Sequence, residues 1–198
     1  MQTFLPYSDF LESADTIDYK AHSRLWKQVL EAKQLLVILQ KMEERSINNT
    51  NEKIGYENHP AIKMWLGYNE LLTHYINSFI KVYNVKANKD LKLLPVTINN
   101  IDEVEKPWWF GNKYFHDSHK ARLLSKNLDY YSDYFNKDKY SKFNNGEYFW
   151  CYSNVPNVFN VIITDKPRML KYKEWFNMNP MTIKYIENKS GCKIIIKK

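Results

Sequence analysis

The sequence predicts a mainly α-helical protein, with a compact body of three helices followed by a small α+β extension at its carboxyl end. Long stretches carry apolar residues at alternating spacings of three and four, which is the period of an amphipathic helix. The last forty residues differ, because they contain β-branched runs that are typical of strands. A chain of 198 residues, 44% of them hydrophobic, is long enough to bury one core with a segment added to it.

Four helical segments are expected before that extension. A short helix is expected in residues 8–18, capped by Ser8 or Asp9. The first long helix, residues 19–45, has one apolar stripe formed by Leu25, Val29, Ala32, Leu36 and Leu39. The second, residues 57–83, has Pro60 in its first turn and a buried face of Ile62, Trp65, Leu72, Ile76, Phe79 and Tyr83. After a surface connection over residues 84–107, a third long helix in residues 106–135 is marked by Ala121, Leu124, Leu128, Tyr131 and Phe135.

The carboxyl end is expected to form a small strand pair that holds two short helices. Residues 158–164 (VFNVIIT) and 192–198 (CKIIIKK) have strand character. Between them, residues 168–176 (RMLKYKEWF) and 180–188 (PMTIKYIEN) have short helical patterns.

The positive charge of the chain is concentrated near its carboxyl end. The formal net charge is +7, but residues 165–198 carry 9 Lys+Arg against 3 Asp+Glu, whereas residues 1–164 carry 20 against 19. Such a segment attracts polyanions. An A/T-rich coding genome is the alternative explanation for the lysine count.

Several classes of protein are disfavoured by the composition. No apolar stretch reaches the roughly 18 residues that a membrane span needs, and no basic region precedes an apolar one at the start, so we expect neither a membrane helix nor a secretory signal. The protein is expected to stay inside the cell, in the nucleus or the cytoplasm. Cys151 and Cys192 are expected to be reduced thiols, because neither has a partner at zinc spacing.

The first long helix carries a polar face opposite its apolar stripe. Arg24, Lys27, Gln28, Glu31 and Gln34 follow one another at steps of three and four residues, so they share this face. Two interpretations stay open at this point. The face is either a solvated surface with ordinary charge pairs, such as Lys27 with Glu31, or a contact surface for a ligand.

The order of four motifs resembles the endonuclease V family of pyrimidine-dimer DNA glycosylases, in particular its cellular branch. The motifs are MQTFLPYSDF at 1–10, RLWKQVLEA at 24–32, NHPAIKMWLGY at 58–68 and PWWFGNKYFHDSH at 107–119. The resemblance implies an endonuclease V-like helical domain in residues 1–152. A basic extension with two short strands and two short helices then occupies residues 153–198.

The resemblance also implies a chemistry for the amino terminus, which in this family inserts between helices. Family enzymes kink duplex DNA, turn a nucleotide out of the stack and attack the sugar C1′ with a free N-terminal amine, while a glutamate on the first long helix handles the proton. This sequence departs from that pattern, because Gln2 is large enough to block removal of Met1 and Leu25 follows Arg24 where the family has its glutamate. Glu31 is the nearby substitute, so Met1 and Glu31 form a conditional catalytic pair.

Basic and polar residues are expected to contact the phosphates of double-stranded DNA. They are Arg24, Lys27 and Gln28 on the first long helix, Lys63 on the second, His119, Lys120, Arg122 and Lys126 on the third, and Arg168, Lys171 and Lys173 in the extension. A solvated helix face is the alternative for those on the third helix. His59 and His116 are expected to form hydrogen bonds at helix starts. The pair His116 and His119 lacks a third zinc ligand, so neither a metal nor a cofactor is expected.

Three functions are consistent with these sequence features. The favoured one is a double-stranded DNA-binding protein on a pyrimidine-dimer glycosylase-like scaffold without glycosylase activity. The first alternative is an active DNA repair glycosylase and AP lyase that uses the N-terminal amine and Glu31. The second is an interaction module unrelated to DNA.

Overall fold

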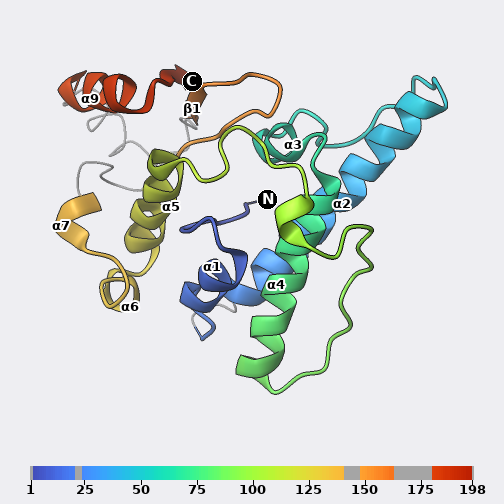
Figure 1. Ribbon diagram of the computed structural model, residues 1–198, viewed down its shortest axis with the longest axis horizontal. Helices are drawn as coiled ribbons and strands as arrows, with labels where there is room; N and C mark the ends of the chain where they lie inside the picture. The colour runs from blue at the N-terminus through green and yellow to red at the C-terminus, as the bar shows by residue number, and fades with distance from the viewer. Residues whose placement is uncertain (1, 21–23, 141–147, 163–179, 198) are drawn as a thin grey trace. The chain divides into compact units, whose positions relative to one another are not determined.

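A computed structural model describes residues 2–20, 24–140, 148–162 and 180–197, apart from the side chains of residues 180 and 181. The described chain is mainly helical, as predicted, with a small parallel sheet near its carboxyl end (Figure 1). It divides into two compact units, Met1–Pro107 and Trp108–Lys198. The predicted division into a family-like domain 1–152 and an extension 153–198 was based on family resemblance, whereas the two units are defined by how compactly they pack. The predicted division therefore stays a prediction.

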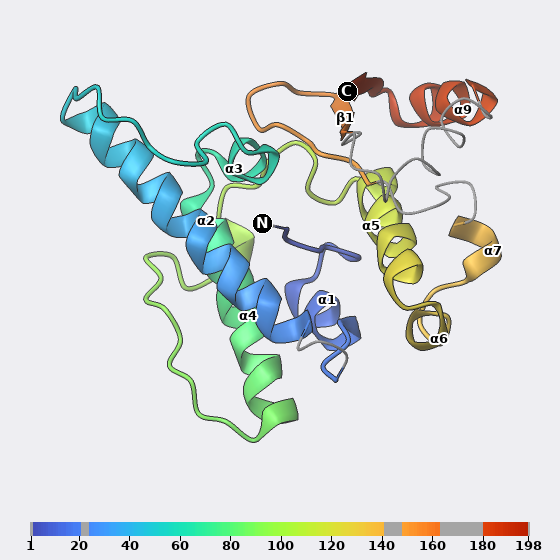
Figure 2. The same ribbon diagram turned by 180° about the vertical axis from the view of Figure 1, so that it is seen from behind.

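The first unit is built on the packing of two long helices. It contains α1 (Phe10–Thr16), α2 (Arg24–Ile47), α3 (Pro60–Trp65), α4 (Asn69–Ala87) and the short 3-10 helix η2 (Ile101–Glu103). α2 and α4 lie side by side, and α1 packs against α4 (Figures 1 and 2). The predicted stripe of α2 is confirmed, because all five of its apolar residues are buried. Each large side chain buried in this core contributes about 1.5–3 kcal/mol.

Local capping explains where the short helices begin. The Asp9 side chain accepts a hydrogen bond from Glu12 N–H at 2.7 Å and caps α1, as expected. His59 Nδ1 accepts from Ala61 N–H at 3.1 Å and caps α3, and Pro60 follows at the first helical position. The predicted hydrogen bond of His59 at a helix start is therefore confirmed.

The second predicted helix is interrupted, which corrects the expectation of one continuous helix over residues 57–83. α3 ends at Trp65 and α4 begins at Asn69. Gly67 lies between them with φ at 86°, a left-handed value that an α-helix does not contain. The residues expected on the buried face are nevertheless buried, except Tyr83, which is half-buried and packs on Trp26 with ring centroids 4.9 Å apart.

Polar side chains of α4 hold the irregular segment that follows the helix. Asn77 accepts from Leu94 N–H at 2.8 Å and donates to its carbonyl at 2.9 Å, so one amide satisfies both backbone groups. Asn84 makes the same two contacts with Leu91, at 3.0 and 2.9 Å. Glu70 accepts from two further N–H groups of the segment. These contacts explain how a connection without regular structure stays on the helix.

We expect Asn77→Ala to lower the free energy of unfolding by about 2 kcal/mol, because it leaves two backbone groups of Leu94 without partners. Urea denaturation measures this change. Lys81→Ala, an exposed position on the same helix, is the control and should change stability by less than about 0.5 kcal/mol. Equal stability of the two variants would contradict the anchoring role of Asn77.

The second unit combines short helices with the small sheet. It contains α5 (Lys113–Lys126), α6 (Leu128–Tyr131), α7 (Lys137–Tyr140), β1 (Val158–Ile162), α9 (Pro180–Ser190) and β2 (Lys193–Lys197). β1 and β2 pair in parallel with Val158 opposite Lys193, which confirms the predicted strand pair. The helical pattern at 180–188 is confirmed by α9, whereas the one at 168–176 lies outside the described residues.

The third predicted long helix is also interrupted. Asn127 leaves the helical conformation, with φ at −157° and ψ at 87°, and its side chain caps α6 by accepting from Tyr130 N–H at 3.3 Å. An Asn side chain competes with the helical backbone in this way, so the pattern continues although the helix does not. Within the described residues, no helix combines the length and apolar character that crossing a membrane requires.

Candidate active site

The residues after Met1 are held by side chains from α2 and α3. Glu31 Oε2 accepts a hydrogen bond from Gln2 N–H at 2.5 Å, and Gln28 Oε1 accepts one from Phe4 N–H at 2.7 Å. Between these contacts, the Trp65 indole donates to Thr3 Oγ1 at 2.9 Å. We call residues 2–5 the amino-terminal segment. A carboxylate and an amide thus hold the backbone at Gln2 and Phe4, and an indole holds the Thr3 side chain between them.

Burial varies along this segment. Thr3, Phe4 and Leu5 are buried, with exposed fractions of 1%, 2% and 0%, whereas Gln2 is half-buried. Glu31 is also half-buried, so its carboxylate lies where the segment emerges from the core. A carboxylate in this position combines a fixed orientation with access to a ligand, as an acid–base group requires.

Tyr75 of α4 completes the interior of the site. Its hydroxyl lies 3.2 Å from Gln28 Oε1 and 3.4 Å from the carbonyl oxygen of Phe4. The pKa of Tyr75 is raised well above 10.0, chiefly by burial and further by the negative charge of Glu31, although its bond to Phe4 opposes the shift. The phenol therefore remains a hydrogen-bond donor at neutral pH.

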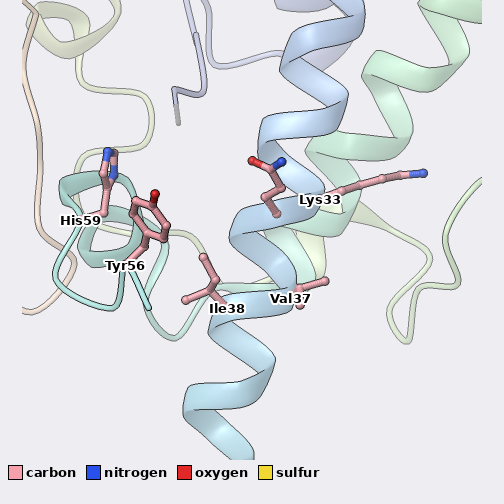
Figure 3. A pocket seen from close by; sticks show the side chains of 6 residues that line it. Lys33, Val37, Ile38, Tyr56 and His59 are labelled. Carbon is pink, nitrogen blue, oxygen red and sulfur yellow. The ribbon is translucent and has the colours of Figure 1, made fainter. Parts of the chain in front are cut away.

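A hollow of about 600 Å³ continues the face of α2 that carries Glu31. It is lined by Lys33, Gln34, Val37, Ile38, Tyr56 and His59. Tyr56 and His59 stand across from α2, Ile38 points toward them, and Lys33 extends away (Figure 3). The pKa of His59 is lowered from 6.5, first by burial and second by the positive charge of the N-terminus, so its imidazole is neutral at pH 7.

The loop that carries Tyr56 is fixed to the far end of α2. Arg45 pairs with Glu57 at 2.7 Å and donates to the carbonyl of Glu52 at 3.0 Å. Tyr56 has φ at 64°, which is uncommon for a residue with a side chain, and its carbonyl accepts from His59 N–H at 2.8 Å. Tyr56 is 73% exposed as a residue, so the loop presents an aromatic side chain at the rim of the hollow.

The side chains of Gln28, Glu31, Trp65 and Tyr75, which contact the amino-terminal segment, lie in the first 91 residues. This stretch is also the part of the chain that a family model matches. Residues 1–91 match the family model for pyrimidine dimer DNA glycosylase. The resemblance predicted from the motifs is confirmed for this stretch, and its predicted continuation to residue 152 stays a prediction. No curated protein and no solved structure matches the chain.

Within the pyrimidine dimer DNA glycosylase match, the predicted site residues of α2 occupy different environments. Glu31 and Gln28 meet at the amino-terminal segment, whereas Lys27 is exposed. Arg24 is half-buried, and its Nε has no hydrogen-bond partner among the described residues. Gln28 is only 3% exposed, and its side chain is covered by the amino-terminal segment that it contacts. Lys63 is half-buried on α3.

Residues expected to contact DNA from the second unit also differ in exposure. His119 is 0% exposed, so it offers no surface for a phosphate, and burial followed by the charge of His116 lowers its pKa from 6.5 to about 3. Lys120 lies 3.9 Å from the buried carboxylate of Asp117, Arg122 is half-buried and Lys126 is exposed. Met1, Arg168, Lys171 and Lys173 lie outside the described residues.

Among the described residues, no group of three or more His, Cys, Asp or Glu side chains is arranged to hold an ion. His116 instead accepts a hydrogen bond from Gly111 N–H at 3.1 Å, near the start of α5, as expected. The interior partners Trp65 and Tyr75 were not predicted as site residues. Their apolar spacing indicates a core position, and no local pattern indicates that their polar atoms reach residues 3 and 4.

Proposed function

We propose that this protein is a DNA repair glycosylase with associated strand cleavage, in which the α-amine of Met1 is the nucleophile and Glu31 handles the proton. The contact that carries the proposal is the 2.5 Å hydrogen bond between Gln2 N–H and Glu31 Oε2. It brings a carboxylate to the residue that follows the amine in the chain. The match of residues 1–91 to pyrimidine dimer DNA glycosylase supports this class of reaction.

The proposed reaction starts on a nucleotide that is turned out of the DNA stack. The amine nitrogen forms a bond to the sugar C1′ as the bond from C1′ to the base breaks, and the base leaves with a proton. Loss of the amine proton and opening of the sugar give an imine between enzyme and DNA. Glu31 accepts and returns protons during these steps because it is fixed beside the segment.

This proposal differs from the function that the sequence features favoured. That function was a double-stranded DNA-binding protein without glycosylase activity. That expectation depended partly on Leu25, which follows Arg24 where the family has its glutamate. Leu25 is 0% exposed on the core side of α2, whereas Glu31 lies on the side that holds the segment. The geometry therefore favours the active alternative, and loss of activity stays a prediction that the following experiment decides.

The experiment is reductive trapping on duplex DNA that contains an abasic site or a pyrimidine dimer. Borohydride reduces the imine, so an active enzyme yields a covalent adduct that migrates slowly in a denaturing gel. The matched control carries Gly-Ser ahead of Met1, which displaces the amine and should prevent trapping. Tight binding of the duplex without an adduct would instead support a DNA-binding protein that lacks glycosylase activity. Intact-mass measurement establishes whether Met1 is the first residue of the protein used.

Double-stranded DNA is the proposed partner. The matched family model describes an enzyme that acts on DNA. The two units also differ in charge: Trp108–Lys198 carries 16 Lys+Arg and 8 Asp+Glu, whereas Met1–Pro107 carries 13 Lys+Arg and 14 Asp+Glu. A surplus of cations provides affinity through counterion release, without information about base sequence. We therefore propose that the second unit supplies most of the general affinity.

We expect Arg24→Gln and Lys27→Gln each to weaken binding of undamaged duplex about threefold to tenfold at low salt, because each removes one phosphate contact. The slope of log affinity against log salt should decrease by about one for each variant, as measured by gel shift across a salt series. Lys81→Gln on α4 is the control. Unchanged slopes for both variants would remove α2 from the proposed DNA surface.

A further inference from the structure

The contacts of the amino-terminal segment fix its register on α2. Gln2 N–H and Phe4 N–H donate hydrogen bonds to side chains of α2. Their acceptors, Glu31 and Gln28, are three residues apart on the helix. Residues two apart in an extended chain present their N–H groups to the same side. The spacing of donors on the segment therefore agrees with the spacing of acceptors on α2.

Thr3 provides a third contact, from the residue between them. Its hydroxyl oxygen accepts from the Trp65 indole at 2.9 Å, and the two residues are 1% and 0% exposed. A slip of the segment by one residue would separate this pair and remove both N–H groups from their acceptors. Burying unpaired polar groups costs about 1–3 kcal/mol each, so the observed register is strongly favoured over its neighbours.

We propose that Gln28 is a positioning residue, which fixes the register of the amino-terminal segment and thereby keeps Gln2 N–H at Glu31. The expected effect of Gln28 on catalysis rests on the proposed function. The fixed register does not depend on that function, because it follows from the contacts of Gln2, Thr3 and Phe4.

Tyr75 orients the amide of Gln28 for this role. Gln28 Oε1 lies 2.7 Å from Phe4 N and 3.2 Å from the Tyr75 hydroxyl. The single proton of that hydroxyl is shared with the Phe4 carbonyl at 3.4 Å, and Gln28 is the nearer acceptor. Turning the amide over would place its NH₂ group against Phe4 N–H, with no acceptor between them. Since Tyr75 is 0% exposed and its phenol keeps its proton, the hydroxyl remains available to hold the amide in one orientation.

The first test compares Gln28→Met and Tyr75→Phe with Gln40→Met, an exposed position on the same helix. The affinity for duplex containing an abasic site is measured by gel shift, and the rate of reductive trapping is measured at saturating DNA. We expect the rate at saturation to fall about tenfold or more in the first two variants, with affinity within about threefold of the wild type. Folded variants with an unchanged saturated rate would overturn the positioning role.

The second test needs no DNA and separates this inference from the proposed function. Limited reductive methylation with formaldehyde and cyanoborohydride labels amines, and mass spectrometry compares the N-terminal peptide with the peptide that contains Lys27. We expect the α-amine to be labelled at least about threefold faster, relative to Lys27, in Gln28→Met and Tyr75→Phe. Equal labelling in wild type and variants would overturn the inference. A wild type that forms no DNA adduct but shows the labelling difference would refute the proposed function alone. If Gln28→Met does not fold, Tyr75→Phe decides both tests.

Discussion

The Glu31→Gln variant is expected to form the trapped DNA adduct at least about 100-fold more slowly than the wild type. Glutamine retains an oxygen that accepts from Gln2 N–H, so the segment stays in place, but it cannot accept and return a proton. General acid–base groups contribute about 10²–10⁴ in rate, and this variant removes only that contribution. Single-turnover trapping on duplex with an abasic site measures the effect.

Glu44→Gln is the control for this variant, because Glu44 is an exposed glutamate of the same helix. Its trapping rate should equal that of the wild type. Both variants should bind the duplex as tightly as the wild type, since removing a negative charge does not weaken contact with phosphates. A Glu31→Gln protein that reacts at the wild-type rate would show that the proton is handled elsewhere.

The second large effect concerns stability in acid and the buried imidazole of His119. The ring lies among Phe115 and Tyr148, with ring centroids 4.3 and 4.9 Å away, and its pKa falls from 6.5 to about 3, first through burial and second through the charge of His116. The unfolded chain binds a proton there below about pH 6.5, whereas the folded chain does so only near pH 3. The stabilising contribution is therefore complete above pH 6.5 and is lost as the pH falls toward 3, at about 1.4 kcal/mol per pH unit.

His119→Gln should make stability less dependent on pH, because glutamine keeps a donor but does not titrate in this range. Between pH 7 and pH 5 we expect the wild type to lose about 2 kcal/mol more than this variant. Urea denaturation at the two pH values measures the difference, in which the titration of groups that do not interact with His119 cancels. Equal losses would mean that the pKa of His119 is the same in the folded and the unfolded chain.

The sequence predicted the elements of this fold better than their interruptions. The apolar stripe of α2 and the β-branched runs of β1 and β2 are periodic over several residues, so the hydrophobic effect determines them locally. The breaks at Gly67 and Asn127 depend on single residues, and the apolar pattern continues across both. Periodicity reports which side of a helix is buried, and it does not report where the helical hydrogen bonds stop.

The candidate site was predictable in part. The resemblance implied a glutamate after Arg24, where Leu25 stands, and Glu31 was the nearby substitute, whose carboxylate the structure brings to Gln2. Gln28 shares that helix face and was expected to contact DNA, but the amino-terminal segment covers it. The contact between Trp65 and Thr3 joins residues 62 positions apart, so no local pattern reveals it. Helical spacing shows which residues share a face, whereas what packs on that face depends on tertiary structure.

Identification of the atom that bonds to DNA tests the central claim most directly. The adduct trapped by borohydride on an abasic duplex is digested with protease and nuclease, and the modified peptide is sequenced by mass spectrometry. The account predicts that the sugar remnant is attached to the α-amine of Met1. Attachment to a lysine side chain, such as Lys27, would contradict it.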